Sequence, residues 1–452
     1  MSNAKHFGAV GDGRADDTAA LQHAVDDGDG VLELTKGRYR ISAPVVLDTT
    51  KRGYLGIRGE QGTAGVVMAG PGPAFLIVGN HQGTAQPDTV QPHTWDDERL
   101  PVVSGFEIVG DHPEADGIRL VRTMKAVIRS VLIRECRYGI HLAERNRNFI
   151  LADSHLYHCT DTGLFLDAVN LHQANVISNH ISYNRRAGIR QRGGDVHNIQ
   201  ITGNDIEYNY GSEALSGEIV LEAADGIASE YTIVSNTIQA RPESRDANIV
   251  VAGRPGEPPD AGRVITITGN VIGHRDRLID LRHAQRVTIS GNTMYGGTTL
   301  GIRLEHCIHT VISGNTLVSR PSAYRDLSRD GILLEDCTGC AVTGNVMNDS
   351  RAGDATSGGC VTLRNCNETA VSSCQILDPK FRGVHLEDTT RCTVTGNTIA
   401  DRRHPREMLT AVAVTGRSQD NVIQANAVTR GTQDAIACDA TRGVVLNNTI
   451  WD

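Results

Sequence analysis

The sequence predicts an all-β fold, a parallel β-helix or solenoid that opens with a short capping helix. Two observations predict it: a short phrase built on asparagine recurs along the chain, and a second phrase of the form Gly-Ile-x-Leu recurs between its copies. The composition agrees, because glycine is frequent at 48 residues while aromatic residues make up only 4%. Short repeats of this kind are typical of stacked coils, each of which buries its apolar side chains only against its neighbours.

The first phrase has the form Ile-Thr-Gly-Asn-x-Ile, and its alternating apolar residues predict short strands on both sides of the asparagine. Asparagine tolerates the left-handed backbone that a tight turn requires, so we expect it at the corner of each coil. Stacked side chains could then form a ladder of hydrogen bonds from coil to coil. Cys374 takes the asparagine position in one repeat, and the asparagines themselves are Asn179, Asn204, Asn236, Asn270, Asn292, Asn315, Asn345, Asn397, Asn426 and Asn448.

The second phrase, seen at Gly117–Leu120, Gly139–Leu142 and Gly301–Leu304, predicts a second strand in each coil. Cys307, Cys337 and Cys366 follow such strands at a constant distance, so we expect these thiols to stack as small buried groups. Cys337 and Cys340 have a spacing seen in zinc sites, but no second pair follows. We therefore interpret the cysteines as structural.

The N-terminal segment predicts a cap on the first coil. Asp17 precedes a short amphipathic stretch, as an N-cap residue does before a helix. Such a helix would cover strand edges and core that the first coil leaves open. We expect residues 1–30 to form this cap and residues 31–452 to form one β-helix domain.

The opening phrase FGAVGDGRADDTAALQ and the following GVLELTKGRYRIS resemble the start of the pectate-lyase-like, right-handed parallel β-helix superfamily. The asparagine repeats extend this resemblance over nearly the whole chain. The superfamily comprises polysaccharide lyases, polygalacturonase-type hydrolases, uronan epimerases, inulin fructotransferases and phage tailspikes. The resemblance therefore implies a right-handed β-helix that acts on or binds a glycan, without naming the reaction.

Outward-facing positions of successive coils should stack in columns about 4.8 Å apart. One column after the asparagine turn contains His155, His180 and Asp205, and a second, two residues further along, contains Arg134, Tyr157 and Glu207. On the Gly-Ile-x-Leu strand the column contains Arg119, His141, Phe165 and Arg190. Later coils place Thr, Val and Gly at these positions, so we expect the functional site between residues 132 and 210.

Arginines concentrate on these coils in a chain whose net charge is −9, which favours the binding of an anionic glycan. Elimination at a uronate requires neutralisation of the sugar carboxylate, a base for the C5 proton and an acid for the leaving oxygen. The favoured hypothesis is therefore a polysaccharide lyase. We expect His155 and His180 to transfer protons with support from Tyr157, and Arg134, His141, Arg186 and Arg190 to bind substrate.

The segment Tyr138–Glu144 resembles the Tyr-Gly-Phe-Asp-Pro-His-Glu motif of bacterial mannuronan C5-epimerases. Tyr138, Glu144 and the later Arg186 match that family, whereas His141 and Ala143 replace its Asp and His. The resemblance implies a related uronate chemistry more than epimerisation itself.

A second hypothesis uses carboxylates. Asp205 and Glu207 should face the same side of one strand roughly 7 Å apart, a separation suited to acid/base cleavage of a glycosidic bond. Asp195, expected in the preceding turn, completes an arrangement similar to that of the inulin fructotransferases. Hydrolysis or intramolecular transfer is the alternative reaction, and a tailspike-like glycan-binding protein without activity is the third hypothesis.

A long insertion from Gly79 to Pro101 carries Trp95, which either anchors the insertion or offers a flat face to a sugar ring. We include Trp95 among the candidate substrate-binding residues.

Other classes of partner are disfavoured. The sequence has no apolar run long enough for a membrane helix, and its acidic charge speaks against nucleic-acid binding. The N-terminal residues lack the apolar centre of a signal peptide and the cysteines show no secreted pattern, which favours a cytoplasmic protein. Secretion is the alternative if a leader segment was removed. We expect no metal site and no cofactor, although calcium between carboxylates of neighbouring coils is compatible with the sequence. The resemblance also implies a possible homotrimer.

Overall fold

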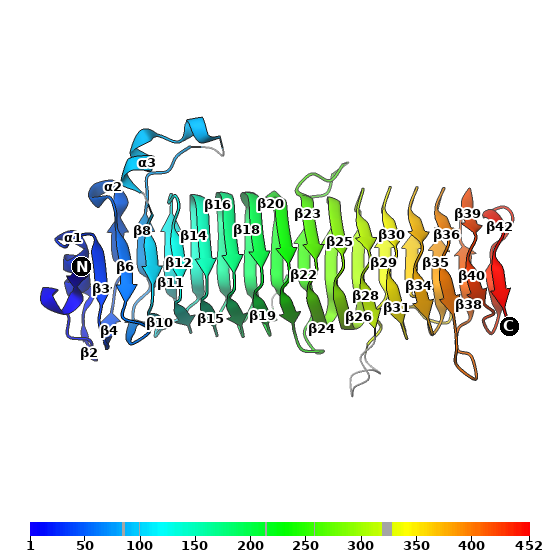
Figure 1. Ribbon diagram of the computed structural model, residues 1–452, viewed down its shortest axis with the longest axis horizontal. Helices are drawn as coiled ribbons and strands as arrows, with labels where there is room; N and C mark the ends of the chain where they lie inside the picture. Colours follow the sequence, from blue (N-terminus) through cyan, green and yellow to red (C-terminus); the bar gives the residue numbers. More distant parts are fainter. Residues whose placement is uncertain (84–85, 99, 213–214, 257, 319–327) are drawn as a thin grey trace. The chain divides into compact units, whose positions relative to one another are not determined.

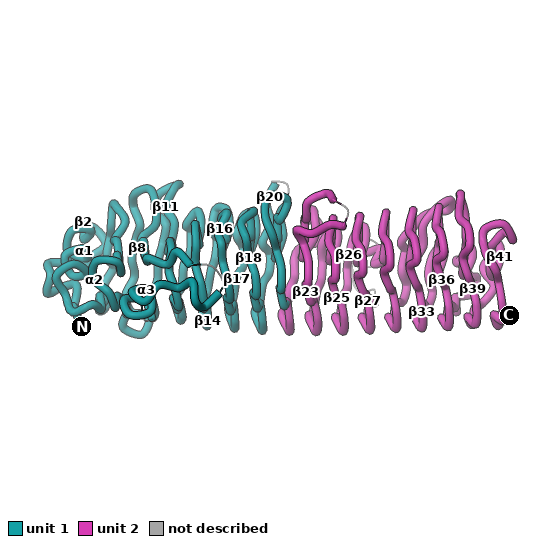
Figure 2. Tube along the Cα trace, turned by 90° about the horizontal axis from the view of Figure 1, so that it is seen from above, with its two compact units in different colours: residues 1–232 teal, residues 233–452 magenta. Residues whose placement is uncertain are grey.

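The computed structural model describes residues 1–452 except 84–85, 99, 213–214, 257 and 319–327. Short strands stack along the chain in parallel, as the two repeated phrases predict (Figure 1). The chain forms two compact units, Met1–Thr232 and Ile233–Asp452, drawn in teal and magenta in Figure 2. The organisation of residues 31–452 as a single domain stays a prediction.

Each coil of the first unit contributes strands to three walls. The first wall contains β2 (Asp12–Asp16), β4 (Gly37–Ile41), β7 (Ala64–Met68), β10 (Glu107–Gly110), β13 (Leu132–Arg134), β15 (His155–Tyr157), β17 (His180–Ser182) and β19 (Asp205–Glu207). The second wall begins with β5 (Val45–Asp48), β8 (Gly72–Val78) and β11 (Ala115–Val121). The third wall begins with β1 (Ser2–Asn3), β3 (Val31–Leu34), β6 (Gly56–Gly59), β9 (Val102–Ser104) and β12 (Val127–Arg129).

Four longer strands continue the second wall around a corner into the third: β14 (Tyr138–Ala152), β16 (Thr162–Ile177), β18 (Ala187–Thr202) and β20 (Gly217–Val234). Residues with positive φ, such as Glu144, Ala168 and Gly193, mark where the first three of these strands turn. A second group with positive φ follows at Asn148, Gln173 and Asn198. We call the stretches between these points, 144–148, 168–173 and 193–198, the corner segments.

The second unit repeats the same three kinds of strand in the same chain order. After the asparagine come β21 (Thr237–Gln239), β24 (Val271–Arg282), β26 (Thr293–Glu305), β28 (Thr316–Val318), β31 (Val346–Asn348), β34 (Gln375–Leu377), β37 (Thr398–Ala400), β40 (Ala427–Thr429) and β43 (Thr449–Trp451). The Gly-Ile-x-Leu type includes β22 (Ala247–Ala252), β29 (Ile332–Glu335), β32 (Val361–Arg364), β35 (Arg382–Glu387), β38 (Thr410–Thr415) and β41 (Asp434–Ala437). The third kind comprises β23 (Gly262–Thr268), β25 (Ala284–Ser290), β27 (Val311–Ser313), β30 (Ala341–Thr343), β33 (Ala370–Ser372), β36 (Thr393–Thr395), β39 (Asn421–Gln424) and β42 (Gly443–Leu446).

The expected asparagine ladder runs through the interior of the coils. In the second unit, Asn270 donates its side-chain amide to Asn292 Oδ1 at 3.0 Å, and Asn292 donates in turn to Asn315 Oδ1 at 2.9 Å. The first unit holds a second ladder, which the repeated phrases did not predict. Asn184 donates to Asn209 Oδ1 at 2.7 Å, and the buried Glu218 accepts the last hydrogen bond of this row.

The cysteines stack as predicted. All ten are free thiols and nine of them are buried. The Cys307 amide donates to Cys337 Sγ at 3.4 Å, so these side chains occupy equivalent places in neighbouring coils. They therefore fill the core as small apolar groups.

Helix α1 (Thr18–Asp26) caps the first coil by burying Leu21, Ala24 and Val25. Asp17 stands at its N-cap as expected but makes no side-chain bond to the helix. Its carboxylate instead accepts hydrogen bonds from the backbone amides of Val10 and Gly11, at 2.6 and 3.1 Å. These bonds hold the segment before the helix in place. The other helices are short: η1 (Ala4–Phe7), α2 (Thr49–Arg52), η2 (Pro87–Thr89) and α3 (Pro92–Asp97). No helix in the part of the chain that is described reaches the length and apolarity of a membrane span.

Candidate functional site

The first wall of the first unit carries the two columns that the sequence predicts. His155, His180 and Asp205 lie opposite one another on β15, β17 and β19. Arg134, Tyr157 and Glu207 occupy the neighbouring column, with Ser182 between the last two. The period-two pattern therefore identified which side chains share this wall.

Contacts join these side chains into one cluster. His155 Nδ1 lies 3.0 Å from the Tyr157 hydroxyl, and the His155 and His180 rings are 5.2 Å apart. His180 Nδ1 lies 3.3 Å from Asp205 Oδ2. Loss of solvent contact and the charge of His180 lower the pKa of His155. Partial burial and the nearby Asp205 carboxylate raise the pKa of Glu207.

Aromatic rings line the turn that follows the first wall. His158, Tyr183 and Tyr208 each have positive φ and stack on one another, with ring centroids 5.1 and 5.6 Å apart. We call this row the aromatic corner. It separates the first wall from the second, and its side chains were not among the residues predicted from sequence.

The first wall also has a hollow of about 360 Å³ nearer the N-terminus. Val67 lines the hollow and lies in register between Arg40 and Val109, so a short side chain follows a long one in this column. Arg134 lines the hollow, but its guanidinium is engaged by Glu107 at 2.7 Å and by Glu135. The other basic side chains of the hollow are Arg14, Arg38 and Arg40.

The second wall holds a more enclosed cluster. Arg119, His141, Phe165 and Arg190 lie in register on β11, β14, β16 and β18, as the sequence predicts. Although these side chains point away from the core, His141 is only 5% exposed, Arg190 3% and Phe165 0%. The sequence pattern indicated their column but not this burial.

His141 is held in one orientation by its neighbours. Its Nε2 lies 3.3 Å from Asp167 Oδ2, its ring stacks on Phe165 at 5.3 Å, and Tyr138 packs edge-on at 5.3 Å. Arg192 binds the other oxygen of Asp167 at 2.6 Å. His141 Nδ1 is buried and has no hydrogen-bond partner among the described residues.

Two charged groups of this cluster have shifted pKa values. Burial alone would raise the pKa of Asp167, but hydrogen bonds from His141 and Arg192 outweigh it and lower the value to about 2. Burial and the nearby Asp161 carboxylate raise the pKa of Tyr138. At neutral pH, Asp167 is therefore ionised and Tyr138 carries its proton.

The arginines of the second wall differ in how they are paired. Arg190 forms an ion pair with Glu222 at 2.5 Å, and Arg186 lies 4.0 Å from Asp161. Arg119 makes no ion pair or side-chain hydrogen bond with any residue that the structure describes, and its Nε is buried. An unpaired guanidinium beside a buried imidazole is the arrangement expected of an anion-binding position.

Asp195 lies apart from the two carboxylates with which the sequence grouped it. It belongs to the corner segment of β18 rather than to a turn, directly after Gly194, whose φ is +78°. Its carboxylate contacts His197 Nε2 at 2.8 Å and Asn170 Nδ2 at 3.0 Å. Asp205 and Glu207 lie on β19 of the first wall.

Trp95 lies on α3, within the long insertion, and is 43% exposed. Lys125 places its ammonium 4.6 Å from the centre of the Trp95 ring. This contact anchors one face of the indole. The role of Trp95 in substrate binding stays a prediction.

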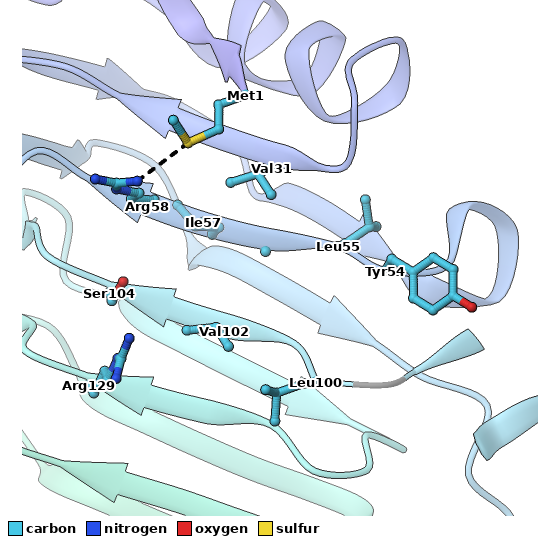
Figure 3. Close-up of a pocket in the computed structure, with 11 residues that line it drawn as sticks. Met1, Val31, Tyr54, Leu55, Ile57, Arg58, Leu100, Val102, Ser104 and Arg129 are labelled. Carbon is cyan, nitrogen blue, oxygen red and sulfur yellow. Dashed lines mark hydrogen bonds between the residues drawn. The ribbon is translucent and has the colours of Figure 1, made fainter. Parts of the chain in front are cut away.

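A further cavity of about 410 Å³ opens on the third wall of the first unit (Figure 3). Its lining is mostly apolar, with Met1, Tyr54 and Leu100 among the exposed side chains. Arg58 and Arg129 are the charged residues that line it. The cavity brings together no acid and base, which sets it apart from the clusters on the first and second walls.

Sequence reasoning missed Asp167 and Arg192, and it noted Tyr138 without including it in the site. A signal was present, because Asp167 and Arg192 stand two residues after Phe165 and Arg190 on the same strands. Extending the column analysis by one outward position would have found both. His172 and His197 lie opposite one another five residues after Asp167 and Arg192. They lie past a corner that the period-two pattern does not reveal.

Comparison with protein families gives three matches. The model described as right handed beta helix region matches residues 228–399 and 330–452, and that of rhamnogalacturonase A/epimerase, pectate lyase-like, matches residues 1–94. A model described as periplasmic copper-binding protein (NosD) matches residues 102–246. A search of curated proteins gave no match.

Solved structures match this chain at low identity. The A-module of the mannuronan C-5 epimerase AlgE4 from Azotobacter vinelandii is 16% identical, with a TM-score of 0.51 over 82% of this chain and 94% of that one. The Dettilon tailspike protein is 16% identical, with a TM-score of 0.49 over 82% of this chain and 66% of its own. The DFA-IIIase from Arthrobacter chlorophenolicus A6 is 13% identical, with a TM-score of 0.39 over 98% and 97%.

These likenesses concern the fold. The family matches and the parallel coils confirm the predicted right-handed parallel β-helix superfamily.

Proposed function

We propose that this protein is a carbohydrate-active enzyme that cleaves an acidic glycan by β-elimination on the second wall of its first unit. The observation that carries the proposal is the His141–Asp167 pair, whose free Nδ1 is buried near the unpaired Arg119. Two of the matched proteins and families support an acidic glycan as the substrate class. The epimerase is named for mannuronan, and the family model that matches residues 1–94 is described as pectate lyase-like.

Each requirement of elimination has a candidate group in the cluster. Arg119 neutralises the sugar carboxylate, which makes the proton on the adjacent C5 removable. With its Nε2–H donating to Asp167, His141 keeps a lone pair on Nδ1 and takes that proton. Tyr138, whose raised pKa keeps it protonated, gives its proton to the leaving O4.

The step balances in bonds and protons. The C5–H bond breaks and its proton moves to His141 Nδ1, while the C5 electron pair forms a double bond between C4 and C5. The C4–O4 bond breaks with its electron pair on oxygen, which receives the Tyr138 proton. Transfer of a proton from His141 to Tyr138 through solvent restores the resting state.

The experiment is a screen of polyuronates with two readouts, ultraviolet absorbance of the new double bond and product mass. On the substrate that turns over, His141→Ala and Arg119→Ala should each lower kcat/KM by about 10²-fold or more. Arg129→Ala is the matched control, because Arg129 is an exposed arginine on the third wall. Full elimination activity in both His141→Ala and Arg119→Ala would show that the site lies elsewhere.

The second candidate function is cleavage without elimination on the first wall. Glu207, whose pKa is raised, suits a general acid, while Asp205 faces His180 and suits the second carboxylate of the pair. His155, Tyr157 and His180, the predicted proton-transfer groups, belong to this cluster. Loss of activity in Glu207→Gln, with products that lack a double bond, would establish this alternative.

The two functions also differ in their dependence on pH. Hydrolysis that needs protonated Glu207 declines as the pH rises through the raised pKa of this residue. Elimination that uses Tyr138 as the acid continues until the pH approaches the raised pKa of the phenol. Glycan binding without any product would instead establish a tailspike-like binding protein, and the homotrimer stays a prediction.

A further inference from the structure

The corner segments of β16 and β18 carry a group of imidazoles and a carboxylate outside the proposed catalytic cluster. The two segments pair in register, which places Asn170 opposite Asp195 and His172 opposite His197. Leu171 and Val196, between these positions, are buried in the core, so the polar side chains face outward. The group lies wholly within the first unit.

Three of these side chains already lie at the spacing of a coordination site. One ligand atom each from His172, Asp195 and His197 lies within 4.8 Å of the other two. The imidazole rings stack in parallel, 4.8 Å between centroids and 7° between planes. Among the described residues, this group alone brings three such ligand atoms together.

The surroundings orient the ligands. Asn170 donates its amide to Asp195 Oδ2 at 3.0 Å, which leaves Oδ1 facing His197 Nε2. Hydrogen bonds of this kind to a ligating carboxylate are typical of the outer shell of metal sites. Gly193 and Gly194, both with positive φ, form the bend directly before Asp195.

A further imidazole lies beside the group. His81 is only 2% exposed, its Nδ1 has no hydrogen-bond partner among the described residues, and it is near enough to His172 for their charges to repel. Burial is the main reason why the pKa of His81 falls to about 4, and Arg145 and Arg147 lower it further.

The charges nearby discriminate between kinds of cation. Arg145 and Arg147 precede Asn170 and His172 in the same columns, and Asp195 and Glu230 offset them. The two arginines repel any cation. A cation therefore binds here only if it also coordinates imidazole nitrogen. That donor set suits Zn²⁺ and related transition-metal ions, whereas Ca²⁺ and Mg²⁺ need oxygen ligands.

We propose that His172, Asp195 and His197 bind one transition-metal dication of the Zn²⁺ class on the corner segments of β16 and β18. This site is independent of the elimination chemistry proposed for the second wall. The sequence led us to expect no metal, because the two histidines stand 25 residues apart and become neighbours only through the coil.

The test is isothermal titration of tag-free, chelator-treated full-length protein with ZnCl₂ at pH 7.5, supported by the visible spectrum of bound Co²⁺. We expect one ion per chain and a rise in the thermal unfolding midpoint on metal addition. His172→Ala and His197→Ala should each weaken binding by more than about 100-fold, while Asn170→Ala should weaken it by about 10–100-fold. Ca²⁺ should not compete.

The matched control is His306→Ala in the second unit. His283 and His306 stack with nearly the same geometry, 4.8 Å and 4°, but form no group of three ligands with Asp336. This variant should bind Zn²⁺ like the parent. Absence of stoichiometric binding, or binding that persists when His172 and His197 are both replaced in a protein with unchanged circular dichroism, would overturn the proposal.

Discussion

Single asparagines have a large effect on stability because each one satisfies several buried groups. Asn292 donates to the Ile267 carbonyl at 3.0 Å and to Asn315 Oδ1 at 2.9 Å, and its own Oδ1 accepts from both the backbone and the side chain of Asn270. The sequence pattern predicted this ladder of hydrogen bonds correctly, but the left-handed backbone expected of the asparagines was wrong. The positive φ lies on the residue before each asparagine, as at Gly269, Gly291 and Gly314.

Replacing Asn292 with alanine should lower the free energy of unfolding by about 3 kcal/mol, since several buried polar groups lose their partners.

The reverse change is available at Cys374, where a thiol stands in the ladder and contacts Asn345 Nδ2 at 3.9 Å. Cys374→Asn should restore the missing hydrogen bonds and stabilise the protein by about 1 kcal/mol. Denaturant midpoints measure both changes, and equal stability of the three proteins would contradict the role given to the ladder.

On the strands, the sequence pattern predicted which residues lie opposite one another better than it predicted which side chains surround them. The columns of His155 with His180 and of His141 with Arg190 follow from the period of two, which depends only on local backbone geometry. The burial of His141 and the pairing of Arg134 with Glu107 depend on side chains from other coils, which no local pattern encodes. Asp195 was assigned to a turn because its paired glycines resemble one.

The pairing of β16 with β18 should depend on pH through Asp167. Its pKa is about 2 in the folded protein against an ordinary value of 3.8, so the folded state favours the charged form. This contribution to stability is complete above pH 4 and is lost as the pH falls towards 2. Asp167→Asn should therefore be less stable than the parent at pH 7, and the difference should shrink at pH 3.

Urea denaturation at pH 7, 4 and 3 measures this difference. Asp153→Asn is the matched control. Asp153 is exposed and lies in the turn that follows β14, and asparagine tolerates its positive φ. The control should follow the parent at every pH. A difference between parent and Asp167→Asn that stays constant from pH 7 to pH 3 would contradict the assignment.

For the molecule as a whole, the thiols report on the integrity of every coil that contains one. Nine of the ten cysteines are buried, and Cys438 alone is partly exposed. Burial raises the pKa of Cys159, Cys360 and Cys392 to about 12, which further suppresses the reactive thiolate.

A thiol reagent should therefore modify one cysteine per native chain and ten after denaturation without reductant. Cys438→Ser should abolish the native reaction and leave nine thiols in denaturant. Rapid modification of several cysteines in the native protein, or fewer than ten in the denatured parent, would contradict the packing described for the coils.

The aromatic corner has a consequence for the regularity of the coils in the first unit. Its rings repeat at 5.1 and 5.6 Å, close to the spacing of neighbouring parallel strands, and their planes differ by only 14° and 7°. Each ring therefore covers the face of the next one. An insertion or deletion of one residue in any of these coils would move its ring out of the row and expose the faces that the stack now covers.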